Sequence, residues 1–125
     1  MRSPAHVLLV EDDADSRDAL SRLLIEMGYS VSSAASGAEA LQYVESDEPC
    51  DAVITDVVMR GMTGVELARR VRVSRPGLPV VLLTGKPDGI ETAVAAGAVP
   101  LVKPVTPERL SQVLGDAFAN RAGKP

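Results

Sequence analysis

Residues 6–13 read HVLLVEDD, an apolar run that ends in three adjacent acids, Glu11, Asp12 and Asp13. The apolar part has the length and the near-continuous Val and Leu content of a strand that is covered on both faces of a parallel sheet. Three neighbouring carboxylates repel one another and resist ionising together. Such a cluster fits either a fully solvated loop or a place where a cation binds, and the rest of the chain decides between these two.

Four further apolar runs follow along the chain, at residues 29–33, 51–55, 79–83 and 100–102. Helix signals separate these runs. Apolar residues recur at helical spacing in 20–27 and 110–117, and they form one apolar side over 64–74. A capping box stands at 36–39, an N-cap at 106, and a short helix is expected at about 89–96. This alternation predicts an α/β fold, a doubly wound five-stranded parallel sheet with helices on both faces. The flavodoxin-like strand order 2-1-3-4-5 fits best, and it places ligands at the carboxyl ends of the strands.

The composition describes one ordinary globular domain. The chain has 125 residues, of which we expect about 5–119 to form the ordered core and 120–125 to be a frayed tail. The single cysteine, Cys50, has no intrachain partner for a disulfide, and no leader or membrane-spanning run is visible, so we expect a cytoplasmic protein without membrane contact. The net charge of −4 argues against a nucleic-acid partner.

Polar groups stand where the predicted strands end. Asp56 follows the third run, Thr84 the fourth and Lys103 the fifth, so they converge with the acid cluster on one edge of the sheet. Mg²⁺ would relieve the repulsion among the acids, and a carboxylate beside it can accept a phosphoryl group. Taken singly, each residue also has an ordinary interpretation, such as Asp13 as a helix N-cap or Lys103 as a surface lysine. Their joint placement favours phosphoryl chemistry.

With these motifs in place, the sequence resembles the receiver domain of bacterial two-component response regulators, over about residues 5–119. The resemblance is carried by VLLVEDD (7–13), DAVITDVVMRGMTGVEL (51–67), VVLLTG (80–85) and LVKP (101–104). It implies a phosphoacceptor, a switch hydroxyl and an essential lysine, which are Asp56, Thr84 and Lys103. It also implies Mg²⁺ as cofactor, with Glu11, Asp12, Asp56 and the backbone carbonyl of Val58 as its protein ligands. A cis Lys103–Pro104 bond is expected for the same reason.

The resemblance implies a function as well. A receiver accepts a phosphoryl group from a sensor histidine kinase or a histidine phosphotransfer protein and switches its protein interactions, so it assists its own modification without being an enzyme. We expect a monomer or weak dimer, with no output domain after the last helix. It would be either a stand-alone regulator or the receiver part of a hybrid kinase or larger regulator, with a slight preference for the hybrid type or a phosphorelay intermediate.

Several positions depart from the family pattern near its output surface. Arg60 replaces a proline, Thr63 an aspartate, Pro100 an aromatic residue and Val105 a phenylalanine, and the stretch between Thr84 and Lys103 is shortened. None of these changes removes a group that phosphorylation requires. Because Pro100 has no ring that could turn inward, signalling through an aromatic gate is not expected here.

Two positions are predicted to set the lifetime of the phosphoryl group. In the family, the residues two after the phosphoacceptor and two after the switch threonine flank the path of the hydrolytic water, and here they are Val58 and Lys86. An apolar side chain does not orient water, and a cation binds the phosphoryl group instead. We therefore predict slow self-dephosphorylation.

Three other functions compete with this interpretation. A catalytically silent pseudo-receiver, acting only as an interaction module, is disfavoured by the intact set of acids, threonine and lysine. A phosphatase of the aspartyl-phosphate type needs an acid where Val58 stands. A mononucleotide-binding domain needs a glycine-rich turn after the first strand, where this chain has three carboxylates.

Overall fold

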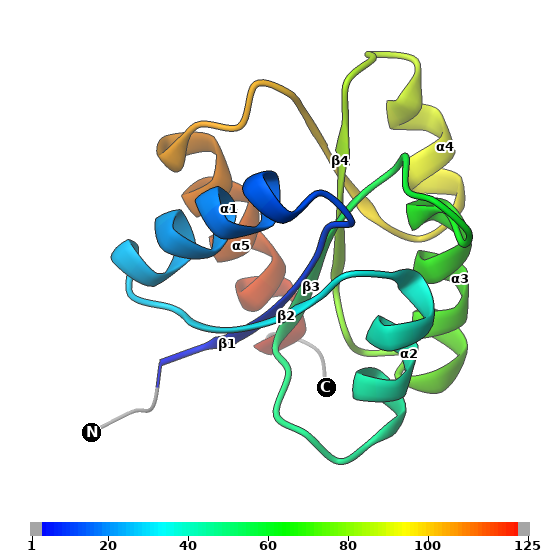
Figure 1. The fold of residues 1–125 in the computed structure, drawn as a ribbon, viewed down its shortest axis with the longest axis horizontal. Helices are drawn as coiled ribbons and strands as arrows, with labels where there is room; N and C mark the ends of the chain where they lie inside the picture. Colours follow the sequence, from blue (N-terminus) through cyan, green and yellow to red (C-terminus); the bar gives the residue numbers. More distant parts are fainter. Residues whose placement is uncertain (1–3, 123–125) are drawn as a thin grey trace.

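The computed structural model describes residues 4–122. Strands and helices alternate along this part of the chain (Figure 1). The strands are β1 (His6–Val10), β2 (Ser30–Ala34), β3 (Ala52–Asp56), β4 (Val80–Thr84) and β5 (Val99–Val102). The helices are α1 (Ala14–Glu26), α2 (Gly37–Glu45), α3 (Gly64–Ser74), α4 (Gly89–Ala95) and α5 (Pro107–Ala122). Of the expected frayed tail, residues 123–125 lie outside the described residues.

The strands form one parallel sheet in the order β2-β1-β3-β4-β5, so the predicted fold class and strand order are confirmed. The predicted strand positions are right to within one residue. Three of the runs begin one residue too early, at Tyr29, Asp51 and Pro79, and β5 begins one residue before its predicted start. Side chains at run ends do not reveal where the hydrogen-bonded ladder begins, and this explains the shift.

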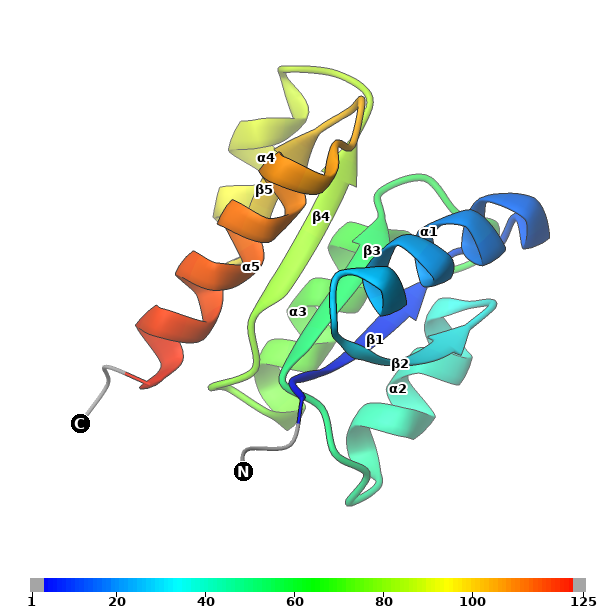
Figure 2. The same ribbon diagram turned by 90° about the vertical axis from the view of Figure 1, so that its left-hand side faces the viewer.

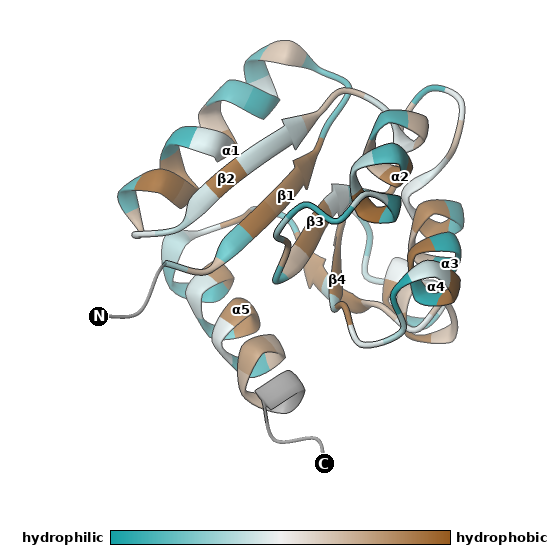
Figure 3. Cartoon of the chain, turned by 90° about the horizontal axis from the view of Figure 1, so that it is seen from below, coloured by the Kyte–Doolittle hydropathy of each residue, from teal (hydrophilic) through white to brown (hydrophobic). Residues whose placement is uncertain are grey.

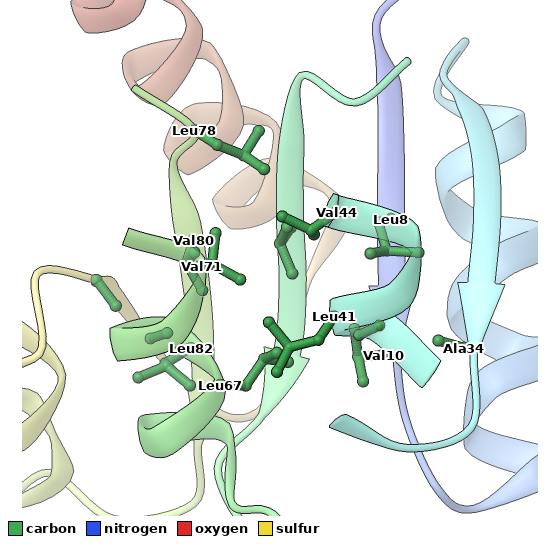
Figure 4. Packing of buried hydrophobic residues seen from close by; sticks show 14 of the residues in the cluster. Leu8, Val10, Ala34, Leu41, Val44, Leu67, Val71, Leu78, Val80 and Leu82 are labelled. Carbon is green, nitrogen blue, oxygen red and sulfur yellow. The ribbon is translucent and has the colours of Figure 1, made fainter. Parts of the chain in front are cut away.

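Helices cover both faces of the sheet. α1 and α5 lie on one face and α2, α3 and α4 on the other (Figure 2). Successive strand residues point to opposite faces, so Leu8 and Val10 of β1 pack toward α2 and α3, whereas Val7 and Leu9 pack toward α1 and α5. Figure 4 shows the first of these two clusters, with Leu41 of α2 and Leu67 of α3 meeting the strands.

The helix starts are fixed by side-chain caps. Asp13, Ser36, Thr63 and Thr106 each accept a hydrogen bond from the backbone N–H three residues later, at 2.9 to 3.2 Å. The predicted caps at Asp13, Ser36 and Thr106 are thereby confirmed, and Thr63, which was not predicted as a cap, caps α3. After α1 the chain turns at Gly28, whose φ of +100° is accessible mainly to glycine.

Hydrophobic and polar residues are segregated as this architecture requires. The strands are mostly hydrophobic, and the helices carry their polar residues on the outside (Figure 3). β2 is the exception, because it is an edge strand with three serine residues, Ser30, Ser32 and Ser33. No helix within residues 4–122 is both long and apolar enough to cross a membrane.

Candidate functional site at the carboxyl ends of the strands

The strand register brings the predicted site residues to one edge of the sheet. Val10 of β1 pairs with Thr55 of β3, so Glu11 and Asp56, the next residues, are neighbours. On the other side of β3, Thr84 of β4 pairs with Val102 of β5, and Lys103 follows directly. The loops that leave β1, β3, β4 and β5 lie in the upper half of the view in Figure 1.

Asp56 and Lys103 form an ion pair across this edge. Lys103 Nζ lies 3.1 Å from Asp56 Oδ1, and the same oxygen accepts a hydrogen bond of 3.0 Å from the N–H of Val57. The Asp56 side chain is 15% exposed and the Lys103 side chain 42%, so both remain reachable from solvent. The Lys103–Pro104 peptide bond is cis, as predicted, and the N–H of Lys103 donates to the carbonyl of Thr84 at 2.8 Å.

Two glycines allow the helices to approach this edge closely. Gly64 opens α3 beside Asp56, and a Cβ at position 64 would overlap the Asp56 carbonyl oxygen. Gly89 opens α4 beside Thr84, and a Cβ there would overlap Thr84 Oγ1. Sequence reasoning took neither glycine as part of the site, since the close approach depends on how each helix packs against the strand that precedes it.

The hydroxyl of Thr84 is buried and engaged. Oγ1 donates to the carbonyl of Lys86 at 3.0 Å and accepts from the N–H of Lys86 at 3.2 Å. Thr84 is 4% exposed, among the few polar residues buried within the described chain. The switch residue of the prediction is therefore tied to the loop between β4 and α4 in this conformation.

Glu11 is the most buried carboxylate of the site, with 6% exposure. Burial raises its pKa, and the neighbouring Asp56 and Asp12 carboxylates raise it further. A hydrogen bond of 3.1 Å from the N–H of Asp13 to Oε2 partly opposes this rise. Arg17 of α1 donates to the Glu11 carbonyl oxygen at 2.9 Å, a contact that the sequence analysis did not identify.

Asp12 has a partner from the loop after β3. Its Oδ2 accepts hydrogen bonds from Arg60, at 2.9 Å from the backbone N–H and at 3.3 Å from Nε. These bonds, the backbone one above all, lower the pKa of Asp12. Asp13, by contrast, caps α1, and the N–H of Ser16 lowers its pKa. The ordinary interpretation of Asp13 as a helix cap is therefore confirmed.

Two hollows open on this edge. One, of about 350 Å³, is lined by Asp56, Val57, Val58, Thr84, Gly85, Lys86, Asp88, Gly89 and Lys103. It unites the phosphoacceptor candidate with both residues predicted to control phosphate lifetime, and it adds Asp88, which the sequence analysis missed. The other lies on the Asp12 side and is lined by Asp12, Asp13, Ala14, Val58, Met59 and Arg60. Val58, which is 79% exposed, stands between the two.

Comparison with known proteins now identifies the family. The response regulator receiver domain matches residues 7–115 of the chain. The chain belongs to the response regulator receiver domain family. It is 38% identical over 122 residues to the transcriptional regulatory protein GlrR of Escherichia coli K12, which covers 95% of this chain and 27% of GlrR. The receiver domain thus spans about a quarter of that relative's length.

Solved structures agree with this assignment. The chemotaxis response regulator CheY4 of Vibrio cholerae superposes with a TM-score of 0.80 at 36% identity, covering 91% of this receiver and 98% of CheY4. The response regulator TrrA of Thermotoga maritima, in complex with Mg²⁺ and BeF, superposes with a TM-score of 0.83 at 28% identity, covering 90% of this receiver and 98% of TrrA. Receivers of two-component systems typically bind Mg²⁺, as the TrrA complex illustrates.

The donor chemistry of this receiver suits such an ion. Glu11, Asp12 and Asp56 offer only carboxylate oxygens, the ligands that Mg²⁺ prefers. The three do not stand together as a ready-made ion site, and no such group of acid, imidazole and thiol side chains occurs elsewhere in the described chain. Asp12 is held by Arg60, and Asp56 by Lys103.

Proposed function

We propose that this receiver accepts a phosphoryl group on Asp56 in a two-component phosphorelay. The observation that carries the proposal is the Asp56–Lys103 pair, with 3.1 Å between Oδ1 and Nζ at the open edge of an otherwise apolar sheet. A lysine at this distance neutralises the carboxylate before transfer and the phosphoryl oxygens after it. The hollow beside the pair has room for a phosphoryl group.

The reaction is a displacement at phosphorus. A carboxylate oxygen of Asp56 attacks the phosphorus of a phosphohistidine, the new P–O bond forms as the P–N bond breaks, and the electron pair leaves with the imidazole, which then takes a proton from water. Asp56 Oδ2 accepts no hydrogen bond from the described residues, so it is the oxygen best placed to attack. The product is an acyl phosphate.

The residues that would hold Mg²⁺ are Glu11, Asp12, Asp56 and, through its backbone carbonyl, Val58. The ion would neutralise the clustered carboxylates and polarise a phosphoryl oxygen. The buried Glu11 would supply an acceptor-only ligand from the floor of the site, since its position is fixed by the N–H of Asp13. Thr84 would turn from the carbonyl of Lys86 to the phosphoryl group and carry the change into the loop before α4.

The partners follow from this chemistry. The phosphoryl donor would be a histidine kinase or a histidine phosphotransfer protein, and the receiver would assist its own phosphorylation without turning over as an enzyme. Its downstream target is open. GlrR is a transcriptional regulatory protein, but that description belongs to a protein of which this chain matches 27%.

A silent pseudo-receiver remains the second candidate, because one observation favours it. Asp12 is occupied by two hydrogen bonds from Arg60 in place of facing a metal. If these bonds never break, Mg²⁺ lacks a ligand, and the domain would act only by binding other proteins.

Chemical phosphorylation separates the two candidates. The protein is incubated with acetyl phosphate, with and without Mg²⁺, and its intact mass is compared with that of Asp56→Asn. We expect one added phosphoryl group that requires both Mg²⁺ and Asp56. An unchanged mass, together with no labelling by a partner kinase, would contradict the proposal and favour the pseudo-receiver.

A further inference from the structure

Arg60 lines the site but has no part in the phosphoryl transfer proposed for Asp56. It lies in the loop between β3 and α3, four residues after Asp56, and both its backbone N–H and its guanidinium donate to Asp12 Oδ2. The two residues are 48 positions apart in the sequence, so the contact closes the β3–α3 loop over the loop that follows β1. The Asp12 side chain is 20% exposed and the Arg60 side chain 87%.

The distribution of charge at the site gives this contact a consequence. Of the three carboxylates, Asp56 is paired with Lys103 and Asp12 with Arg60, while the buried Glu11 carboxylate forms no ion pair with another described residue. Lys103 would keep a negatively charged partner after the transfer, because its ammonium would then pair with the phosphoryl oxygens. Arg60 points instead to the hollow on the Asp12 side. A divalent ion bound to Asp12 would place two more positive charges beside the guanidinium. The ion and the guanidinium would repel each other.

We propose that Arg60 is an internal competitor of Mg²⁺ for Asp12 and so sets the Mg²⁺ concentration at which Asp56 becomes a phosphoacceptor. The inference rests on the proposed function, since it takes Asp12 as a ligand of the ion. Because the Arg60 side chain is almost fully exposed, it leaves at little cost, and the competition is reversible. The conformation in which Arg60 occupies Asp12 is then the low-Mg²⁺ state of a working receiver, and not the sign of a silent pseudo-receiver.

The two hydrogen bonds of Arg60 have different chemical origins, and this makes the inference testable in two steps. An alanine at position 60 keeps the backbone N–H and removes only the guanidinium. A proline removes both donors, because it has no N–H. Competition by charge predicts that alanine already lowers the Mg²⁺ Kd, and that proline, which also removes the stronger backbone donor to Asp12, lowers it further.

The experiment is a calorimetric titration of MgCl₂ into metal-free protein. Wild type, Arg60→Ala and Arg60→Pro are compared with Arg70→Ala, which removes the same charge from an exposed pair with Glu66 on α3. We expect Arg60→Ala to lower the Mg²⁺ Kd by roughly three- to fivefold relative to wild type, the upper part of the range of an exposed ion pair. The Mg²⁺ Kd of Arg70→Ala should stay within about twofold of the wild-type value, since long-range charge effects are screened by salt.

A second readout does not depend on the heat of binding. Mg²⁺ raises the melting temperature of any protein that binds it in the folded state only. In EDTA, Arg60→Ala and Arg70→Ala should melt at similar temperatures, because each loses one exposed ion pair, and added Mg²⁺ should raise the melting temperature of Arg60→Ala more. Arg60→Pro is included only if its circular dichroism matches that of wild type, and Arg60→Ala carries the test without it.

The outcomes separate the inference from the proposed function. If Arg60→Ala and Arg70→Ala bind Mg²⁺ equally, and Asp12→Asn binds it more weakly than wild type, the competition is refuted while the metal site stands. If Asp12→Asn binds Mg²⁺ as wild type does, or if no variant binds it, Asp12 is not a ligand and the inference fails, while phosphorylation of Asp56 is decided separately by the acetyl phosphate experiment. A tighter Kd in Arg60→Ala alone supports the inference.

Discussion

Glu11 shows how one residue links the stability of this receiver to its chemistry. It is buried beside two other carboxylates, and its pKa lies above the ordinary glutamate value of about 4.3. A folded-state pKa above the unfolded one means that the fold prefers the protonated side chain. Its contribution to stability is therefore largest below the unfolded pKa and is lost as the pH rises through the folded pKa.

Replacing Glu11 by glutamine should remove this pH dependence. In EDTA at pH 7, we expect Glu11→Gln to be at least as stable as wild type, since the amide still accepts the Asp13 N–H without carrying a charge. The difference should shrink as the pH falls through the raised pKa of Glu11, where the wild-type side chain takes up a proton. Urea unfolding at several pH values measures it, and a Glu11→Gln variant that is clearly less stable at pH 7 would show that the buried charge is compensated.

The lifetime of the acyl phosphate is a second property set by single residues. Val58 and Lys86 line the hollow that contains Asp56, as an apolar side chain and a cation. Val58→Asn would orient a water molecule for attack, and Lys86→Glu would remove a charge that favours the phosphorylated state. We predict that each substitution speeds phosphate loss several-fold from a slow wild-type rate.

The rate of phosphate loss is measured by following the intact mass of the protein after removal of acetyl phosphate. Val73→Asn and Arg69→Glu serve as controls, since both positions are exposed on α3, outside the lining of that hollow. A wild type that loses its phosphoryl group as fast as the Val58→Asn variant would refute the prediction.

At the scale of elements, the helix caps are the strongest local determinants of the fold. Ser36 caps α2 by accepting from the N–H of Glu39 at 3.1 Å. Ser36→Ala should therefore lower the free energy of unfolding by about 1 kcal/mol, and the melting temperature by about 3–5 °C. Ser111→Ala, in the exposed part of α5, is the control and should leave stability unchanged or slightly higher. Equal melting temperatures for the two variants would mean that the cap contributes nothing.

α4 and β5 lie in the stretch where the sequence analysis found two departures from the family pattern near its output surface, a shortening and Pro100. α4 has seven residues, and β5 carries Pro100 beside Leu82 of β4. The aromatic residues of the chain lie elsewhere, with Tyr29 against Phe118 and Tyr43 stacked on His6. A ring that turns inward behind Thr84 is absent from β5. Output through this face would depend on the contact between Gly89 and Thr84, which couples the hydroxyl to the start of α4.

For the whole molecule, the sequence predicted the architecture well because the apolar runs are short, regularly spaced and separated by caps. β1, β3 and β4 are buried on both faces, so their continuous apolar runs predict central strands of a parallel sheet. The same topology placed Asp56, Thr84 and Lys103 on one edge, since parallel strands end together. These residues could be predicted from order alone, without knowing any side-chain position.

What the sequence could not predict depends on loop conformation and on how closely the helices pack. The contact between Asp12 and Arg60 joins two loops, and Arg60 looked only like a departure from the family. The packing of Gly64 on Asp56 and of Gly89 on Thr84 depends on how closely two helices approach the sheet. Asp88 joined the site for the same reason. Such contacts depend on loop conformation, about which periodicity carries no information.

The central claim, an acyl phosphate on Asp56, has one direct measurement. The protein is treated with acetyl phosphate and Mg²⁺ and then with sodium borohydride, which reduces an aspartyl phosphate to homoserine and leaves free carboxylates intact. Fragment masses of the tryptic peptides ending at Arg17 and Arg60, which contain Asp12 and Asp56 respectively, then locate the modified residue. We predict homoserine at position 56 alone, and only when Mg²⁺ was present. Homoserine at Asp12 or Asp51, or at no position, would contradict the account.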